Sequence, residues 1–179
     1  MLLKSWEQLP EDMRTPAVRP YYERLQKKKA GLIAKRAGDV LLSAILIVLL
    51  SPVLLVISLV IVCDSRGGVF FRQKRVTTYG RVFRIFKFRT MVRNAESLGS
   101  QVTVSNDSRV TRCGRFLRKY RLDELPQLFN VVKGEMSLVG PRPERPFFVE
   151  KFKEEVPLYM LKHLVRPGIT GWAQVNGWR

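Results

Sequence analysis

A long uncharged, apolar run at residues 40–63 constrains the fold of this chain more than any other feature. A straight helix over this run would be about 36 Å long, enough to cross a bilayer. Pro52 lies near its middle, where a proline removes a backbone hydrogen bond and bends a helix. The neighbouring Ser51 hydroxyl can satisfy a backbone group freed by that break. The run therefore predicts either one spanning helix or two helices joined at Ser51 and Pro52.

Basic residues flank the apolar run on both sides. Lys35 and Arg36 precede it, and Arg66 and Arg72 follow it, in a chain whose formal net charge is +17. Positive charge marks the cytoplasmic side of a membrane segment, so both flanks favour the cytoplasm. A hairpin that enters one leaflet and returns satisfies both flanks, whereas a spanning helix satisfies one. Charge and proline position alone leave both arrangements open.

Outside the run, the patterns predict a small mixed domain. Residues 1–36 are polar and interrupted by prolines, so we expect a loosely ordered basic arm with one short helix. Residues 68–91 are rich in β-branched and aromatic side chains around Tyr79 and Gly80, which predicts a β-hairpin. Apolar spacing predicts a helix at 109–120 and a second helix that Gly134 ends.

Cations and phenylalanines alternate through the expected hairpin. Nine basic residues and no acidic residue fall within 66–93. A basic, aromatic surface beside a membrane helix suits the lipid headgroup layer, and anionic lipids would strengthen the attachment. We favour this interfacial surface over an ordinary hairpin core.

Two adjacent carboxylates, Asp123 and Glu124, stand at the start of the second helix. We expect Asp123 to be its N-cap, where the helix dipole favours negative charge. Most such residues only cap, but Arg118 and Arg121 lie just upstream, and a helix N-terminus beside arginines suits a phosphate group. One carboxylate could attack a phosphorus atom while the other holds a divalent cation.

Two further loops could contact phosphate groups. Pro141 and Pro143 fix the backbone around Arg142, which suits bidentate phosphate recognition as well as a plain rigid loop. The stretch 166–177 is rich in glycine, which lets backbone N–H groups approach a ligand. The single histidine, His163, makes a histidine metal site or a Ser-His triad improbable, and we expect it to be structural.

Together these motifs resemble the monotopic bacterial phosphoglycosyl transferases, also called bacterial sugar transferases, over residues 35–177. The motifs are KR at 35–36 with Asp39, SP at 51–52, KFRTM at 87–91, LDELPQL at 122–128, SLVGPRP at 137–143 and RPGITGW at 166–172. Val76 or Thr77 stands near the first glycine of the Arg-x-Gly-x-x-Gly turn usual in this family. Family members also continue past the last motif, so we expect a truncated chain.

The resemblance implies a reaction and assigns residues to it. Asp123 would be the nucleophile, Glu124 a Mg²⁺ ligand, and Arg118 and Arg142 contacts to the substrate phosphates. The donor would be a UDP-sugar, the acceptor undecaprenyl phosphate and the released product UMP. Glucose, galactose and N-acetylated sugars all fit the diphosphate contacts.

The resemblance also implies a re-entrant helix hairpin broken at Ser51 and Pro52, on the cytoplasmic face of the bacterial inner membrane. We therefore expect an α+β, mostly helical, monotopic protein. It would comprise a basic arm (1–36), the membrane hairpin (37–64) and a cytoplasmic transferase domain (65–179) with a short β-hairpin and irregular loops. A homodimer is compatible with the sequence.

Three alternatives compete with this assignment. The charge of +17 suits a nucleic-acid-binding protein, but the charge lies beside a membrane segment and no nucleic-acid motif is present, so we expect no nucleic-acid partner. A membrane anchor without chemistry leaves Asp123, Glu124 and Arg142 unexplained. Within the enzyme hypothesis, the lipid phosphate could attack directly in a ternary complex, with Asp123 acting as a base or only as a cap.

Overall fold

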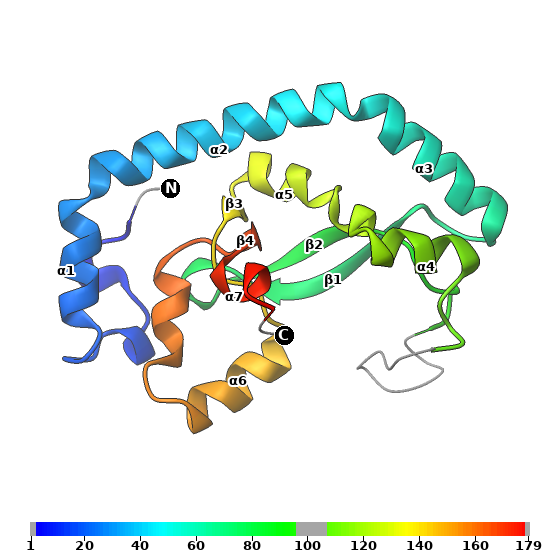
Figure 1. The fold of residues 1–179 in the computed structure, drawn as a ribbon. Coiled ribbons are helices and arrows are strands. Elements are labelled where there is room, and N and C mark those ends of the chain that lie inside the picture. Colours follow the sequence, from blue (N-terminus) through cyan, green and yellow to red (C-terminus); the bar gives the residue numbers. More distant parts are fainter. Residues whose placement is uncertain (1–2, 96–106, 178–179) are drawn as a thin grey trace.

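A bent pair of long helices forms an arch over the rest of the chain (Figure 1). The computed structural model describes residues 3–95 and 107–177. Helix α2 (Lys29–Leu49) and helix α3 (Ser51–Asp64) meet at Leu50 with a bend of 61°. Taken with its long β-hairpin and short helices, the chain is mixed and mostly helical, as the sequence predicts.

The break between α2 and α3 lies where the sequence predicts it. Pro52 is in the first turn of α3, where the missing N–H costs no helical hydrogen bond. The Ser51 hydroxyl donates to the Val48 carbonyl at 2.7 Å and so satisfies a group at the end of α2. Within the described residues, no unbroken helix has both the length and the apolar character to cross a bilayer, whereas the bent pair has both.

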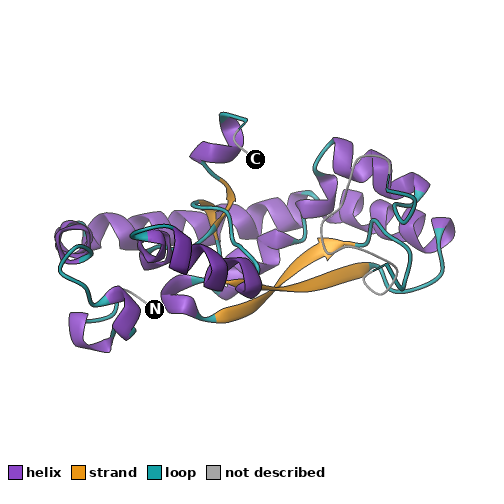
Figure 2. Ribbon diagram, turned by 90° about the horizontal axis from the view of Figure 1, so that it is seen from below, coloured by secondary structure: helices purple, strands orange, loops and turns teal. Residues whose placement is uncertain are grey.

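The predicted β-hairpin is confirmed. Strand β1 (Phe70–Val76) pairs antiparallel with strand β2 (Val82–Phe88), and Figure 2 shows them as one twisted ribbon. The tight turn between them contains η3 (Thr78–Gly80), in which Tyr79 has a φ of 61° and Gly80 a φ of 73°. A tyrosine therefore adopts a left-handed conformation that favours glycine, and its buried ring packs in the core.

Three short helical segments follow in the part of the chain described from residue 107 onward. Helix α4 (Arg112–Lys119) begins at the N-cap Thr111, whose hydroxyl accepts from the Gly114 N–H at 3.0 Å. A 3₁₀ turn, η4 (Leu122–Glu124), then leads to helix α5 (Gln127–Lys133). Gly134 ends α5 with a φ of 88°, as the sequence predicts.

The expectation that Asp123 caps the second helix is wrong. Asp123 lies inside the 3₁₀ turn, and Pro126 occupies the N-cap position of α5. Arg121, with a left-handed φ of 59°, ends the chain path of α4 and precedes this turn. The chain therefore makes a separate tight turn at the carboxylates before α5 begins.

The last third of the chain builds a second, smaller sheet. Strands β3 (Ser137–Val139) and β4 (Gly168–Thr170) pair in parallel. Between them lie α6 (Pro146–Glu155) and η5 (Tyr159–Leu164), and the short helix α7 (Trp172–Val175) follows β4. Gly140 and Gly168 let the two backbones approach closely, because a Cβ on Gly168 would lie 2.1 Å from the Gly140 nitrogen.

The N-terminal segment is packed rather than loosely ordered, which corrects that expectation for the residues described. It forms η1 (Trp6–Gln8), η2 (Glu11–Met13) and α1 (Arg19–Lys27). Its apolar side chains are buried in one core cluster with residues of the hairpin turn, α6 and η5. The buried N-terminal members are Leu9, Met13, Val18 and Tyr22.

The hairpin is also less of a basic, aromatic surface than expected. Phe83 and Phe88 are buried in core clusters. The buried Arg89 guanidinium donates to the carbonyls of Ser65 and Arg66 at 2.6 and 2.7 Å, so it closes the end of α3. The interfacial hypothesis is therefore wrong for these three side chains, because each belongs to the interior.

Candidate functional site

The tight turn at 122–124 brings two carboxylates into the interior. Asp123 is 7% exposed and Glu124 8% exposed, although aspartate and glutamate are seldom buried without partners. The turn packs on β2 and beside α4, so both carboxylates lie over the hairpin ribbon. Such burial requires compensating charge or hydrogen bonds.

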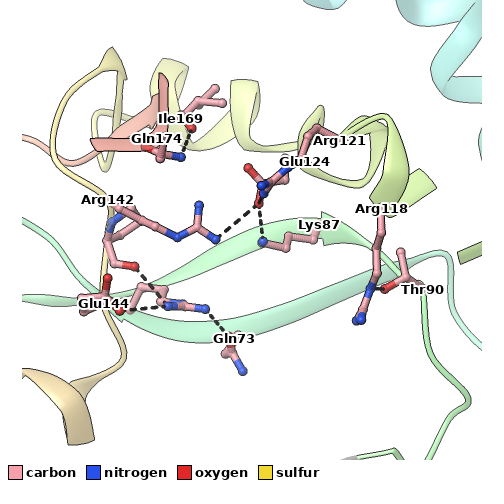
Figure 3. Close-up of polar contacts among 12 residues, drawn as sticks. Gln73, Lys87, Thr90, Arg118, Arg121, Glu124, Arg142, Glu144, Ile169 and Gln174 are labelled. Carbon is pink, nitrogen blue, oxygen red and sulfur yellow. Dashed lines mark hydrogen bonds and ion pairs between the residues drawn. The ribbon is translucent and has the colours of Figure 1, made fainter. Parts of the chain in front are cut away.

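Three cations surround the Glu124 carboxylate (Figure 3). The Lys87 Nζ lies 2.8 Å from its Oε1, Arg142 approaches that oxygen at 3.7 Å and Arg121 at 3.9 Å. These side chains come from β2, the loop after β3 and the turn before η4. Even with Asp123 counted beside Glu124, the three cations outnumber the carboxylates, so the cluster carries excess positive charge that an anion could balance.

The pKa values of the two carboxylates are shifted in opposite directions. Burial raises the pKa of Asp123, and the charges of Lys87 and Arg118 oppose this only in part. Burial would also raise the pKa of Glu124, but Lys87, by its charge and its hydrogen bond, and then Arg142 lower that pKa below its ordinary value. Glu124 is therefore the more firmly ionised member of the pair.

The sequence analysis quoted Lys87 within a motif but gave it no role. Alternation along β2 provides a signal that could have found it, because Phe83 and Ile85 face inward and Lys87 follows in phase. Asn130 fixes α5 beside this strand, accepting from the Phe86 N–H at 2.9 Å and donating to the Arg84 carbonyl at 2.9 Å. The relative position of Lys87 and Glu124 thus depends on a buried asparagine.

The loop that carries Arg142 is held from below by the hairpin. The Arg75 guanidinium donates to the Pro143 carbonyl at 3.1 Å and lies 3.8 Å from the Glu144 carboxylate. The Val76 N–H donates to the Glu144 carbonyl at 2.9 Å. The Arg142 side chain itself remains 40% exposed. A fixed backbone therefore presents an accessible guanidinium beside Glu124.

Arg118 does not join the cluster around Glu124. Its Nε donates to the Thr90 hydroxyl at 2.8 Å, and Figure 3 shows its side chain directed away from Glu124. Gly114 lets helix α4 lie against the backbone of Thr90, since a Cβ at this position would be 2.1 Å from the Thr90 carbonyl oxygen. Arg118 still acts on Asp123 through its charge. Its predicted contact with a substrate phosphate stays a prediction.

A second polar cluster joins α2 to the domain, and we call it the helix joint: Lys35, Arg36, Asp39 and Ser137. Lys35 Nζ lies 2.8 Å from the Asp39 carboxylate, which also accepts from the Ser137 hydroxyl at 2.6 Å. Arg36 donates to the Val131 carbonyl at 2.8 Å and to the Val132 carbonyl at 3.2 Å. The joint therefore ties the start of the apolar helix to the end of α5.

Glu124, the predicted metal ligand, lies next to the carboxylate of Asp123 in the same 3₁₀ turn. Across residues 3–95 and 107–177, no three His, Cys, Asp or Glu side chains gather as a metal site. Magnesium is often held by one or two carboxylates together with substrate phosphates. Asp123 and Glu124 fit that donor set.

Comparisons with known proteins identify the family of this chain. The family model described as bacterial sugar transferase matches residues 30–179. The UDP-N-acetylgalactosamine-undecaprenyl-phosphate N-acetylgalactosaminephosphotransferase of Aeromonas hydrophila is 53% identical over 141 residues, which are 79% of this chain and 33% of that protein. The UDP-glucose:undecaprenyl-phosphate glucose-1-phosphate transferase of Escherichia coli K12 is 44% identical over 170 residues, 94% of this chain and 36% of that protein.

The UDP-glucose:undecaprenyl-phosphate glucose-1-phosphate transferase of Caulobacter vibrioides is 43% identical over 147 residues, 82% of this chain and 55% of that protein. The chain thus spans about a third of the length of the first two relatives and about half of the third.

Proposed function

This chain belongs to the bacterial sugar transferase family, and from that premise we propose that it transfers a sugar 1-phosphate from a UDP-sugar to undecaprenyl phosphate, releasing UMP. The activities for which its relatives are named support the donor, the acceptor and the reaction class. Those names include both glucose and N-acetylgalactosamine as the transferred sugar, so the choice of sugar is a separate question.

One observation carries the proposal: a buried carboxylate pair lies beneath excess positive charge. Lys87, Arg121 and Arg142 all approach Glu124 within 4 Å. The diphosphate of a UDP-sugar supplies the anionic charge that this cluster lacks, and guanidinium groups match phosphate oxygens in bidentate geometry. We assign Arg142 to the diphosphate, because its backbone is held while its side chain is exposed.

We assign Asp123 as the nucleophile. A carboxylate oxygen of Asp123 attacks the sugar-linked phosphorus, and the bond from that phosphorus to the bridging oxygen breaks. UMP leaves with the bonding electron pair, and the sugar phosphate stays on Asp123 as an acyl phosphate. An oxygen of the lipid phosphate then attacks the same phosphorus and expels the Asp123 carboxylate. Two steps let one site use a soluble donor and a membrane acceptor in turn.

We assign Glu124 as the residue that would hold Mg²⁺. When bound there, Mg²⁺ would neutralise adjacent phosphate charges and would make the departing phosphate a better leaving group. The lowered pKa of Glu124 supports this role, because metal ligands must be deprotonated. Lys87 keeps the Glu124 carboxylate charged and oriented before substrate and metal bind.

We further propose that α2 and α3 form a re-entrant hairpin whose two ends face the cytoplasm. The bend of 61°, the proline at the break and basic residues on both flanks support this arrangement. Single cysteines placed at Lys28 and Gly68, after removal of Cys63 and Cys113, can be labelled from outside intact cells with an impermeant thiol reagent. Labelling of one site alone would show a spanning segment.

The covalent step has a direct test. The full-length protein in membranes is mixed with labelled UDP-sugar in the absence of lipid acceptor, and Asp123 is examined by mass spectrometry. We expect a sugar-phosphate adduct on Asp123 together with UMP release. An active enzyme that shows no adduct, and that releases UMP only after the lipid is added, would establish direct transfer in a ternary complex.

A further inference from the structure

A large groove runs along the first half of α2, and residues of β3, η3 and η5 also line it. Its volume is about 760 Å³. Hydrocarbon side chains form most of its wall, among them Leu32, Val40, Leu41, Val139 and Leu164. Leu41 is 65% exposed and Val139 57% exposed, so the groove presents apolar surface to its surroundings. It is large enough for a hydrocarbon chain.

Basic side chains stand among the apolar wall residues. Lys35, Arg36, Arg81 and Arg166 line the groove, and Asp39 is the single acidic residue among its lining side chains. Asp39 is already bonded to Lys35 and Ser137, so the groove keeps a surplus of positive charge. An occupant with an anionic end matches that surplus.

Two of these arginines meet at the end of α5. Arg36 donates to the carbonyls of Val131 and Val132, and the Nε of Arg166 donates to the Gly134 carbonyl at 3.0 Å. The two guanidiniums are close enough that the charge of Arg166 lowers the pKa of Arg36, after burial itself. Like charges held side by side at a groove wall favour an anion between or beside them.

The groove begins before the apolar run 40–63 and extends along the start of that run. Its lining follows α2 from Leu32 to Ala44, about 18 Å at 1.5 Å per residue. The basic positions Lys35 and Arg36 precede the uncharged residues 40–63, and Leu41 and Ala44 lie within that run. An amphiphile would therefore place its charged end before the membrane segment and its chain beside it.

We propose that this groove binds an anionic glycerophospholipid of the surrounding membrane, with its phosphate among the basic side chains of the groove wall, Arg81 included, and one acyl chain along α2. The inference rests on the proposed function in one respect, the insertion of α2 and α3 into a bilayer. The lining includes neither Asp123, Glu124 nor Lys87. The occupant is therefore a bound structural lipid rather than the acceptor, whose phosphate must reach Asp123.

The test uses native mass spectrometry of the full chain extracted from vesicles that contain phosphatidylglycerol or phosphatidylcholine. We expect the wild-type protein to retain phosphatidylglycerol. Ala44→Trp fills the groove and should lower the retained fraction about tenfold, equivalent to about 1.4 kcal/mol. Ala34→Trp is the matched control, since Ala34 is exposed on the same helix and does not line the groove. Equal retention by the two variants would overturn the proposal.

The headgroup has its own pair of variants. Arg81→Gln should reduce the preference for phosphatidylglycerol over phosphatidylcholine, whereas Arg84→Gln, an exposed position on β2 outside the groove, should leave it unchanged. Equal retention of both lipids by the wild type would overturn the anionic assignment. Displacement of phosphatidylglycerol by added undecaprenyl phosphate would overturn the structural-lipid assignment in favour of an acceptor site.

Crosslinking gives a result even where Ala44→Trp does not fold. A photoreactive p-benzoylphenylalanine at Val139 should crosslink to phosphatidylglycerol, and the same group at Val82, equally exposed and outside the groove, should not. UMP release from UDP-sugar is measured on the same samples. Lipid retention without UMP release would contradict the proposed function alone, and UMP release without lipid retention would contradict the groove alone.

Discussion

Two clusters of this protein use the same kinds of charged residue for different purposes. In the helix joint, Lys35 meets Asp39 and Arg36 meets backbone carbonyls, so each charge has a partner within the protein. Around Glu124, three cations share one carboxylate at 2.8 to 3.9 Å. The charged groups of the joint are hydrogen-bonded or paired within the protein, whereas the Glu124 cluster has exposed guanidiniums that can take an anion from outside the chain.

The two clusters share a buried carboxylate and differ in how their arginines are held, since Arg36 of the joint donates to backbone carbonyls of the protein. Asp39 is held at 10% side-chain exposure between Lys35 and Ser137. Arg142 and Arg121 keep 40% and 53% of their side chains exposed beside the buried Glu124. Side chains bonded within the protein contribute to stability, and accessible guanidiniums contribute to ligand binding. Substitutions in the two clusters should therefore affect different measurements.

The largest expected effect is on Asp123. Asp123→Asn keeps the shape of the side chain and removes the nucleophile, so transfer should fall on the order of 10⁴-fold. The circular dichroism spectrum and melting temperature should stay close to those of the wild type, because the neutral amide is easier to bury. Transfer is measured as UMP release in membranes. An Asp123→Asn variant with wild-type turnover would exclude covalent catalysis by this residue.

Glu124→Gln should have the next largest effect. The substitution leaves Lys87 without its closest anionic partner and removes the proposed Mg²⁺ ligand. We expect turnover to fall on the order of 100-fold and the Mg²⁺ concentration for half-maximal activity to rise, because a neutral amide is a weaker ligand for a hard cation. A Mg²⁺ titration of UMP release provides the measurement. Unchanged Mg²⁺ dependence would mean that another group holds the metal.

Arg36→Met should affect stability instead of chemistry. It removes the donors to the carbonyls of Val131 and Val132, and the free energy of unfolding should fall by about 1–3 kcal/mol. Turnover per folded molecule should change little. Thermal unfolding in detergent measures the loss, with Arg24→Met, exposed on α1, as the control. Lost turnover at an unchanged melting temperature would place Arg36 in the functional site.

The smallest effect concerns His163, a buried ionisable group that belongs to neither cluster. Burial, and then the charge of Lys162, lowers its pKa from 6.5 to about 4, while Asp12 opposes the shift. The unfolded chain therefore binds a proton more readily than the folded protein between pH 6.5 and 4, and stability falls as the pH drops through this window.

For this residue we expect a loss of about 1 kcal/mol between pH 7 and pH 5.5. The measurement compares melting temperatures at the two pH values in the wild type and in His163→Leu. The variant should lose less stability on acidification than the wild type. Equal losses would show that His163 does not carry the pH dependence.

Features governed by local backbone chemistry followed directly from the sequence. Pro52 can follow a helix break but cannot sit inside an uninterrupted helical ladder, and α2 does end just before it. Gly134 tolerates the left-handed φ that ends α5. The β-hairpin and the mixed, mostly helical composition were predictable for the same reason, since turn residues and apolar periodicity act over a few positions.

The N-terminal segment was predicted wrongly because its order depends on distant residues. Prolines and polar residues at 1–36 predict a loose arm, yet Leu9 and Met13 are buried against η5. Asp123 was predicted as a helix cap because its neighbours have helical periodicity. The left-handed Arg121 and the 3₁₀ turn that displaced the cap position reflect packing of this turn on β2.

The sequence by itself determined the apolar run, its break, and the motifs that identify the family, including the adjacent carboxylates Asp123 and Glu124. Only the tertiary structure decided which charges meet. Lys87 reaches Glu124 across 37 positions, Arg36 reaches Val131 across 95, and Arg118 turns to Thr90 instead of Glu124. The physical reason is that an ion pair depends on strand register and helix docking, which Asn130 and buried side chains far apart in the chain fix together.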